Sequence, residues 1–398
     1  MIIGIVGKPN VGKSAFFSSL TLAEADSQNF PFTTIDANSG MGYVKVKDPA
    51  QDFGKVSDPR EGYVNGSYRF VPVKVVDVAG LVPGAHEGRG LGNKFLDDLR
   101  EADVLIHVVD LSGSTNENGE PVDKNSYDTG KDIEFLEEEI DLWYYNILEK
   151  HWPNIHKKLR LQDMKLEIAL SDVMSGLNVK EKEIIRALDE LNLTKDNLGD
   201  NLFEFTKKIR EISKPMVIAA NKTDALIKDG TWETKLTNLR ERYPQYKIIP
   251  VMAEYEKNLK QASKNELIDY IPGENSFTLK NEENLNENQK KGLELIEKHL
   301  QELNSTGVQD CINYAVFELL GYLPIFPGGS SKLEDDKGNT LPDCFLMPPK
   351  STALDFAFKL HTDFGKKFIR AINVRENMPV GKNQELNFAD IIEIISGK

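Results

Sequence analysis

The first part of the chain alternates short apolar runs with stretches that have a helical period. The apolar runs predict buried strands at residues 2–6, 69–76 and 104–110, with a further strand near 42–47, and helices at 13–22 and 92–100. Strands that alternate with helices are typical of a doubly wound α/β sheet. We expect one hairpin-like pair, between the strands near 42–47 and 69–76, to break the strict alternation.

The pattern changes after Asp110. The sequence predicts a polar loop at residues 112–119. It then predicts helices from 132 to 213, where apolar residues recur at helical spacing, for example Leu136, Ile140, Trp143, Tyr144 and Ile147. Residues 114–212 hold 22 acidic and 14 basic residues, which is −8 of the chain's net −14. This predicts an acidic helical insertion. Its Trp143-Tyr144-Tyr145 cluster is either a partner-binding face or core packing, and core packing is favoured.

The rest of the chain predicts two further units. Residues 254–303 read as a helical stretch interrupted at 272–275, and 307–320 as a helix that returns to the first sheet. From 322 to 398 the pattern is a small mixed unit of β-grasp type. It comprises a first strand, a strand at 341–347, a helix capped by Ser351 that runs to about His361, and strands at 368–373 and 390–395.

A phosphate-binding motif follows the first strand directly. Residues 7–14 read Gly-Lys-Pro-Asn-Val-Gly-Lys-Ser, between a buried strand and a predicted helix. Its backbone amides and the helix dipole would hold a pyrophosphate, Lys13 would reach the β- and γ-phosphates, and Ser14 would bind Mg²⁺. The candidate nucleotide-binding residues here are Asn10, Val11, Gly12, Lys13, Ser14 and Ala15.

A second motif identifies the base. An apolar run at 215–220 ends in Asn221-Lys222-Thr223-Asp224. The Asp224 carboxylate can accept hydrogen bonds from N1–H and the exocyclic amine of guanine, and adenine lacks this donor pair. Asn221 would tie this loop to the phosphate loop and Lys222 would pack on the base, although a polar turn after a strand has the same composition. After a strand at 248–251, Ala253 is the candidate for the loop behind the base.

Between these motifs lies Asp77-Val78-Ala79-Gly80, at the end of a predicted strand. Asp77 would hold a water bound to Mg²⁺, and the amide of Gly80 would contact the γ-phosphate. Upstream, Thr33 and Thr34 both offer a hydroxyl where a switch loop would place one on Mg²⁺, and we favour Thr34.

These motifs, in this order, resemble the translation-factor class of P-loop GTPases, and within it the Obg family, in the branch of YchF and the Obg-like ATPases. The resemblance rests on residues 7–14, 29–35 and the glycine-rich block 77–95, while 360–366 and 380–381 resemble a TGS domain. It implies a GTPase domain at 1–113 and 213–321 with an additional helical stretch near 254–303, the insertion at 114–212, and a TGS domain at 322–398. ATP-preferring members have an altered base motif, and the intact motif at 221–224 favours GTP.

Position 81 is unusual for a GTPase, because Leu81 cannot orient water as the glutamine of Ras-like GTPases does. The resemblance implies the class with a hydrophobic residue there. His86 and Arg89 are candidates to act on water or the γ-phosphate, and solvated switch-loop side chains are the alternative. We therefore take Lys13, Thr34, Gly80 and His86 as the candidate catalytic residues. Asn10 is a candidate to recruit K⁺, as in some GTPases with Asn at this position.

Composition sets the remaining expectations. Two cysteines predict no disulfide framework and a reducing cytoplasm, and the first core strand at the N-terminus predicts that no signal peptide precedes it. No apolar run reaches membrane-spanning length. The net charge of −14 argues against broad nucleic-acid binding, although the basic residues 366, 367, 370 and 375 either contact ribosomal RNA or form a solvated face. We expect a monomer.

Together these features predict a slow, Mg²⁺-dependent GTP hydrolase that acts as a switch. Its partner, by resemblance, is the ribosome or a ribosome-associated factor. Two alternatives stay open: a nucleotide-gated binding module whose hydrolysis is incidental, and a hydrolase that prefers ATP.

Overall fold

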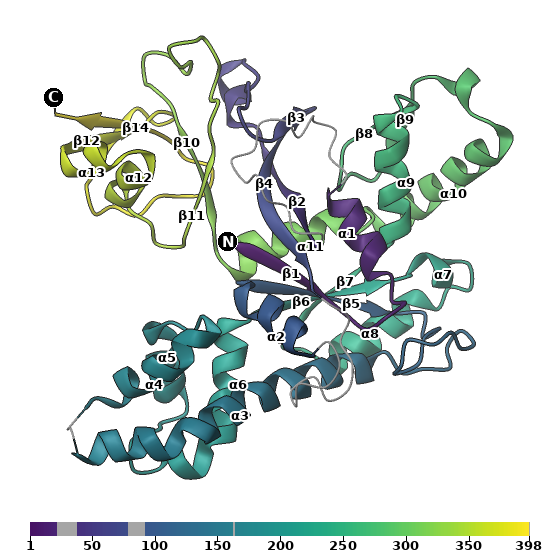
Figure 1. Cartoon of the computed structure of the whole chain (residues 1–398). Coiled ribbons are helices and arrows are strands. Elements are labelled where there is room, and N and C mark those ends of the chain that lie inside the picture. Colours follow the sequence, from purple (N-terminus) through teal and green to yellow (C-terminus); the bar gives the residue numbers. More distant parts are fainter. Residues whose placement is uncertain (22–37, 79–91, 162–163, 398) are drawn as a thin grey trace.

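The computed structural model describes residues 1–21, 38–78, 92–161 and 164–397. Its largest sheet has seven strands in the order β2-β4-β1-β5-β6-β7, with β3 paired to β4 (Figure 1). The strands are β1 (Ile2–Val6), β2 (Ser39–Lys47), β3 (Tyr63–Asn65), β4 (Tyr68–Asp77), β5 (Val104–Asp110), β6 (Met216–Asn221) and β7 (Lys247–Pro250). All neighbouring strands from β4 to β7 are parallel, and β2 is antiparallel to β4. The predicted α/β fold with its hairpin-like pair is confirmed; β3 was not predicted.

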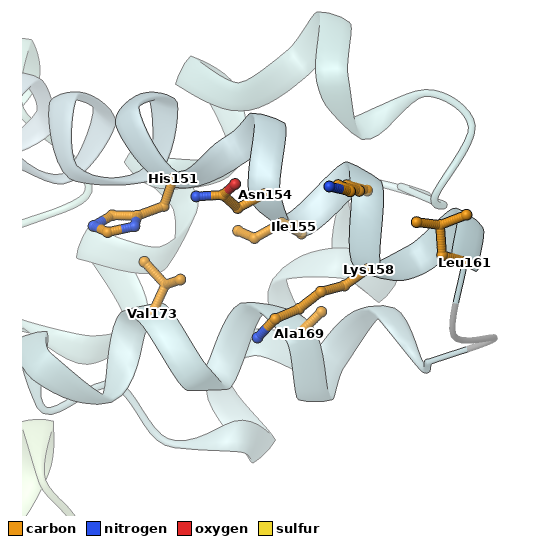
Figure 2. Close-up of a pocket in the computed structure, with 8 residues that line it drawn as sticks. His151, Asn154, Ile155, Lys158, Leu161, Ala169 and Val173 are labelled. Carbon is orange, nitrogen blue, oxygen red and sulfur yellow. The ribbon is translucent and has the colours of Figure 1, made fainter.

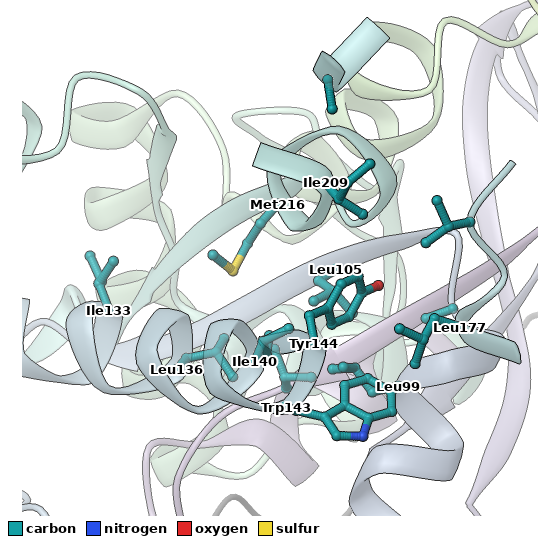
Figure 3. Close-up of a cluster of buried hydrophobic side chains, with 14 of the residues drawn as sticks. Leu99, Leu105, Ile133, Leu136, Ile140, Trp143, Tyr144, Leu177, Ile209 and Met216 are labelled. Carbon is teal, nitrogen blue, oxygen red and sulfur yellow. The ribbon is translucent and has the colours of Figure 1, made fainter. Parts of the chain in front are cut away.

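Both faces of this sheet are buried, and successive side chains serve opposite faces. Ile3, Ile5, Ile106 and Val108 belong to one core, together with residues of α1 (Lys13–Thr21) and α11 (Val308–Asn313). Leu105 and Val109 belong to the other core, shared with the helical insertion and with helices α2 (Gly92–Glu101) and α8 (Trp232–Arg242) (Figure 3). The near-continuous apolar runs of these strands follow from this two-sided burial.

The insertion between β5 and β6 is helical, as predicted. It comprises α3 (Gly130–Leu161), α4 (Leu166–Met174), α5 (Glu181–Glu190) and α6 (Leu202–Ser213), and α3 packs along α6. Trp143 and Tyr144 are 5% and 0% exposed, so the core-packing interpretation is correct for both (Figure 3). The buried Arg210 of α6 donates to Asp141 of α3 at 2.8 Å, a charge-assisted bond that joins the two helices.

The stretch from 253 to 303 differs from the prediction. Helices lie on both sides of the predicted interruption at 272–275, α9 (Ala253–Lys264) and α10 (Glu287–Leu303), but the interruption is longer than predicted and contains an antiparallel hairpin of β8 (Ile268–Tyr270) and β9 (Phe277–Leu279). The Pro-Gly segment at 272–273 lies in the turn of this hairpin. Ile268 and Tyr270 alternate with exposed Asp269, so the local period is two and the strand buries one face. The predicted returning helix at 307–320 begins as α11 and continues as a π-helical segment at Tyr314–Leu319.

The C-terminal unit is a five-stranded sheet in the order β11-β10-β14-β12-β13 with two short helices. Its elements are β10 (Leu323–Pro327), β11 (Phe345–Met347), α12 (Ala353–Leu360), α13 (Thr362–Lys366), β12 (Phe368–Asn373), β13 (Met378–Val380) and β14 (Ile391–Ser396). The N-cap of α12 is Thr352 rather than Ser351, because Thr352 and Asp355 form a reciprocal capping box. The Ser351 hydroxyl donates instead to the Pro348 carbonyl at 2.7 Å.

The C-terminal unit is attached to the large sheet by polar and apolar contacts. The Arg69 guanidinium of β4, 1% exposed, donates to the carbonyls of Leu341 and Pro342 at 2.9 and 3.0 Å. Arg375 forms an ion pair with Asp52 at 2.8 Å. In the part of the chain that the structure describes, no helix is long and apolar enough to cross a membrane.

Candidate nucleotide-binding site

The phosphate-loop motif joins β1 to α1 at the C-terminal edge of the sheet. The amide of Phe16 donates to the carbonyl of Gly12 at 2.9 Å, which closes the first turn of α1. Gly12 has a φ of 92°, and a Cβ there would lie 2.2 Å from Nδ2 of Asn221, so only glycine fits. Val11 is fully buried, Ser14 is exposed and Ala15 is half-buried. The first turn of α1 contains no acidic residue, so its amides and dipole favour an anion.

Lys13 and Asp77 come together across the site. The Lys13 ammonium donates to Oδ1 of Asp77 in a short ion pair, and the two side chains are 13% and 23% exposed. Both groups are therefore accessible from the surface. A triphosphate would offer Lys13 a more highly charged partner and would release the Asp77 carboxylate for a water bound to a metal ion.

Asn221 connects three loops at the end of β6. Its Nδ2 donates to the carbonyl of Val11 at 2.9 Å, and its Oδ1 accepts from the amide of Ala253 at 3.1 Å. The side chain is 4% exposed, so both bonds lie in the protein interior. One residue of the base motif thus fixes the phosphate loop and the start of α9 relative to each other.

Lys222 extends from the same loop to a buried carboxylate. Its ammonium donates to Oδ2 of Asp110 at 2.8 Å. Asp110, 1% exposed, also accepts from the hydroxyls of Ser114 and Thr115 at 2.8 and 3.0 Å. Burial alone would raise the pKa of Asp110, but hydrogen bonds from Lys222, Ser112 and Ser114 outweigh burial and hold the pKa below its ordinary value.

The Asp110 cluster was missed by reasoning from the sequence. The available signal was its position: Asp110 ends a buried strand and pairs in register with Asn221 of the neighbouring parallel strand. Parallel strands bring their carboxyl ends to one edge of a sheet, which is where ligands bind in such folds.

Asp224 begins α7 (Asp224–Ile227) and is half-buried. Burial raises the pKa of its carboxyl group above the ordinary value. Among the described residues it has no ion-pair partner. Beside it, the His299 ring of α10 stacks on Tyr255 of α9, with ring centroids 5.6 Å apart. This aromatic pair was not predicted, because its two residues are 44 positions apart in the chain.

The loop between β5 and α3 closes over the phosphate loop. The buried Lys8 donates to Asp132 of α3 at 2.8 Å and to the carbonyl of Thr115 at 3.0 Å, and it lies 3.8 Å from the Tyr127 ring centroid. Nδ2 of Asn10 donates to the carbonyl of Gly119 at 2.9 Å. The phosphate loop is therefore fastened directly to the first turn of the helical insertion, a connection that the motif alone did not indicate.

Several candidate residues lie outside the described part of the chain. These are Thr33, Thr34, Gly80, Leu81, His86 and Arg89. The structure therefore does not place the switch-loop hydroxyl, the γ-phosphate amide or the candidate groups for orienting water.

A separate hollow of about 390 Å³ lies between α3 and α4, far along the insertion (Figure 2). Its lining includes His151, Lys158, Leu161 and Val173. None of the phosphate or base motif residues line this hollow, so it is not part of the nucleotide site.

Comparisons with known proteins show which family the chain resembles. The family model described as "50S ribosome-binding GTPase" matches residues 2–142, "Obg-like GTPase YGR210-like, G4 motif-containing domain" matches 219–329, and "TGS domain" matches 337–396. The chain is 44% identical to the uncharacterized GTP-binding protein MJ1332 of Methanocaldococcus jannaschii over 99% of both chains. It is 30% identical to Obg-like ATPase 1 of Gallus gallus, over 93% of this chain and 81% of that protein.

Among solved structures, a GTP binding protein from Pyrococcus horikoshii OT3 superimposes with a TM-score of 0.79. It is 40% identical and the match covers 100% of both chains. Full-length similarity, the three family models and the arrangement of the phosphate and base loops lead to one conclusion. The chain belongs to the YchF and Obg-like family of P-loop GTPases that carry a C-terminal TGS domain.

Proposed function

We propose that this protein is a Mg²⁺-dependent GTP hydrolase that works as a nucleotide-controlled switch and prefers GTP to ATP. The observation that carries the proposal is that the Asn221 side chain forms two hydrogen bonds, one to the Val11 carbonyl and one from the Ala253 amide. These two hydrogen bonds join the base motif to the phosphate loop, which supports the proposal that a single nucleotide contacts both. Asn10, Val11, Gly12, Lys13, Ser14 and Ala15 would hold the phosphates, and Asn221, Lys222, Asp224 and Ala253 the base end.

The preference for guanine rests on Asp224. Its carboxylate has no ion pair among the described residues and would accept both hydrogen bonds from a guanine edge. With adenine the same half-buried carboxylate would face an acceptor and remain unpaired, which costs about 1–3 kcal/mol or more for a charged group. The alternative is that this protein prefers ATP to GTP, because one relative is named Obg-like ATPase 1.

Mg²⁺ fits the donors that the site offers. Mg²⁺ prefers oxygen ligands and binds through one or two protein groups together with phosphates and water. The Ser14 hydroxyl and the Asp77 carboxylate are such donors, and Thr34 is proposed as a third. Bound there, the ion would neutralise charge on the β- and γ-phosphates.

The chain's own catalytic groups are few. We propose that Lys13 neutralises phosphate charge, that Thr34 and Gly80 hold the switch loops on the γ-phosphate, and that His86 or a partner's side chain completes the site. Leu81 has no group that orients water, so unassisted turnover should be slow. K⁺ is a candidate activator near Asn10, whose oxygen has no partner among the described residues.

The proposed partner, which would respond to the nucleotide state of the protein, is the ribosome. The support is the family model described as a 50S ribosome-binding GTPase, matched at 2–142, and the TGS domain. In this proposal the GTPase domain is 1–113 with 213–321, and the insertion at 114–212 and the TGS domain at 322–398 report the nucleotide state. The protein would act as a cytoplasmic monomer.

The experiment that tests the switch is turnover of GTP with Mg²⁺ or with EDTA, each with and without K⁺ and 50S subunits. We expect slow hydrolysis that needs Mg²⁺ and accelerates with subunits or K⁺. Asp77→Asn should lose hydrolysis and keep GDP binding. Negligible hydrolysis under every condition, with GTP binding intact, would instead favour a nucleotide-gated binding module.

A further inference from the structure

Two aromatic side chains, one from the start of α9 and one from the end of α10, lie against the base motif. The Tyr255 and His299 rings are stacked with an interplanar angle of 18°. Both side chains interact electrostatically with the Asp224 carboxylate. The carboxylate that is proposed to read the base therefore has an imidazole and a phenol as neighbours, and both come from helices outside the base motif.

Packing fixes the position of His299 relative to the base motif. Its neighbour Leu300 belongs to one hydrophobic cluster with Ile227 of α7 and with Met252, in the loop behind the base. The Met252 amide also donates to the carbonyl of Thr306, just beyond α10, at 2.9 Å. The end of α10 is therefore joined both to the helix that begins with the base-reading carboxylate and to the loop behind the base.

The His299 side chain is buried, but one of its nitrogens is unsatisfied. The residue is 6% exposed, and its Nδ1 has no hydrogen-bond partner among the described residues. A buried polar atom without a partner is rare in native proteins and calls for an explanation. A neutral imidazole has one N–H donor, and a protonated ring has two. His299 thus keeps hydrogen-bonding capacity beside the Asp224 carboxylate, which forms no ion pair among the described residues.

Guanine recognition needs the Asp224 carboxyl group in its ionised form, because protonation uses one of its acceptor sites. Burial raises the pKa of Asp224 and so works against this form. The interactions with His299 and Lys222 lower the pKa again, while the nearby Glu254 raises it. His299 is therefore one of two side chains that favour the carboxylate which guanine requires.

The surroundings of His299 act on its own charge in both directions. Burial lowers the pKa of the imidazole. The carboxylates of Glu302 and Asp224 oppose this effect, and Lys298 adds to it.

We propose that His299 is a positioning residue for guanine recognition, which keeps the Asp224 carboxylate ionised and turned toward the base. Stacking on Tyr255 would hold the imidazole in place. This inference rests on the proposed function, because His299 has this role only if Asp224 reads the base. The competing explanation is that His299 only fills space beside Tyr255.

The test compares His299→Phe with the wild type by GDP titration calorimetry. Phenylalanine keeps a flat ring against Tyr255 and removes both nitrogens. GDP binding should weaken by about tenfold, near the lower end for loss of a hydrogen bond to a charged group. His299→Asn, which keeps an N–H donor close to the position of Nδ1, should recover part of this loss. The matched control is His156→Phe, at an imidazole 6.1 Å from the Trp152 ring in the insertion, which should leave GDP affinity unchanged.

Two readouts separate positioning from packing. GDP affinity should fall as Asp224 takes up a proton, and in His299→Phe this fall should begin at a higher pH, because a group that lowers the pKa of Asp224 is gone. In an Asp224→Asn background, His299→Phe should have no further effect on GDP affinity, because residues that act through one contact are not additive. A residue that only fills space would shift no pH profile and would give additive effects.

Wild-type GDP affinity in His299→Phe, an unshifted pH profile or additive effects of the two changes would overturn the inference. If Asp224→Asn weakens GDP binding and His299→Phe does not, the proposed guanine recognition stands and only the role of His299 fails. If Asp224→Asn leaves GDP binding unchanged, Asp224 does not read the base and both fail. Urea unfolding checks that each variant is folded, and His299→Leu, which suits the neighbouring apolar cluster, takes the place of His299→Phe if that variant does not fold.

Discussion

Replacing Asn221 by alanine would test how the nucleotide site is held together. The change removes the bond to the Val11 carbonyl at 2.9 Å and the bond from the Ala253 amide at 3.1 Å. Val11 and Ala253 are 0% and 1% exposed, so water does not readily replace either partner. Both backbone groups would be left buried and unsatisfied.

The expected cost follows from these two groups. A buried polar group left without a partner costs about 1–3 kcal/mol, so the pair predicts a loss of about 2–6 kcal/mol in the free energy of unfolding. The same change frees the phosphate loop from the start of α9. GDP affinity should therefore fall by at least about tenfold, or 1.4 kcal/mol.

Urea unfolding and GDP titration calorimetry measure the two effects. Hydrogen exchange at the Ala253 amide adds a local readout and should speed up in the variant. The control is Asn154→Ala, at an exposed asparagine of α3, which should change stability by less than about 0.5 kcal/mol. An Asn221→Ala protein with wild-type stability, GDP affinity and exchange would refute this role of Asn221.

Three further predictions concern the same site. Gly12→Ala should abolish measurable GDP binding in calorimetry while the protein stays folded, because its Cβ would lie 2.2 Å from Nδ2 of Asn221. Lys8→Met should lower the free energy of unfolding by about 3–5 kcal/mol at pH 7, measured by urea unfolding, because it leaves the buried Asp132 carboxylate without its ion-pair partner. Burial raises the pKa of the Asp132 carboxyl to about 6 even though Lys8 lowers it, so removing Lys8 should raise this pKa further. The deficit should therefore shrink as the pH falls from 7 towards 6, because the variant takes up a proton on Asp132 before the wild type does. GDP affinity should fall as the pH drops below 7 and the Asp224 carboxyl, whose pKa is raised by burial, takes up a proton, because a protonated carboxyl is a poorer acceptor. Asp224→Asn should remove this pH dependence and should favour xanthosine diphosphate over GDP.

Local patterns predicted most of the fold. The strands at 2–6, 104–110 and 368–373 have the predicted bounds, because each is a short run of residues with strand propensity between clear turn signals. The long helices of the insertion followed from apolar residues at helical spacing. The hairpin at 268–279 was missed because each of its strands has only three residues, too few for alternation to be distinguished from a helical pattern in the sequence alone.

The nucleotide site was predictable where a motif carries it and not where distant residues complete it. The motifs at 7–14 and 221–224 are contiguous, and their chemistry can be read from spacing alone. Lys8 and Asp132 are 124 residues apart, and neither side chain indicates the other before the fold is known. The same holds for Lys222 and Asp110, which meet only because β5 and β6 are neighbours in the sheet.

The most direct test of the account is competition between GDP, GTP and ATP, with Mg²⁺, for the purified chain. The account predicts that guanine nucleotides bind at least about a hundredfold more tightly than ATP, a difference of about 2.7 kcal/mol. Equal competition by ATP would show that Asp224 does not read the base, and would contradict the proposed GTP preference.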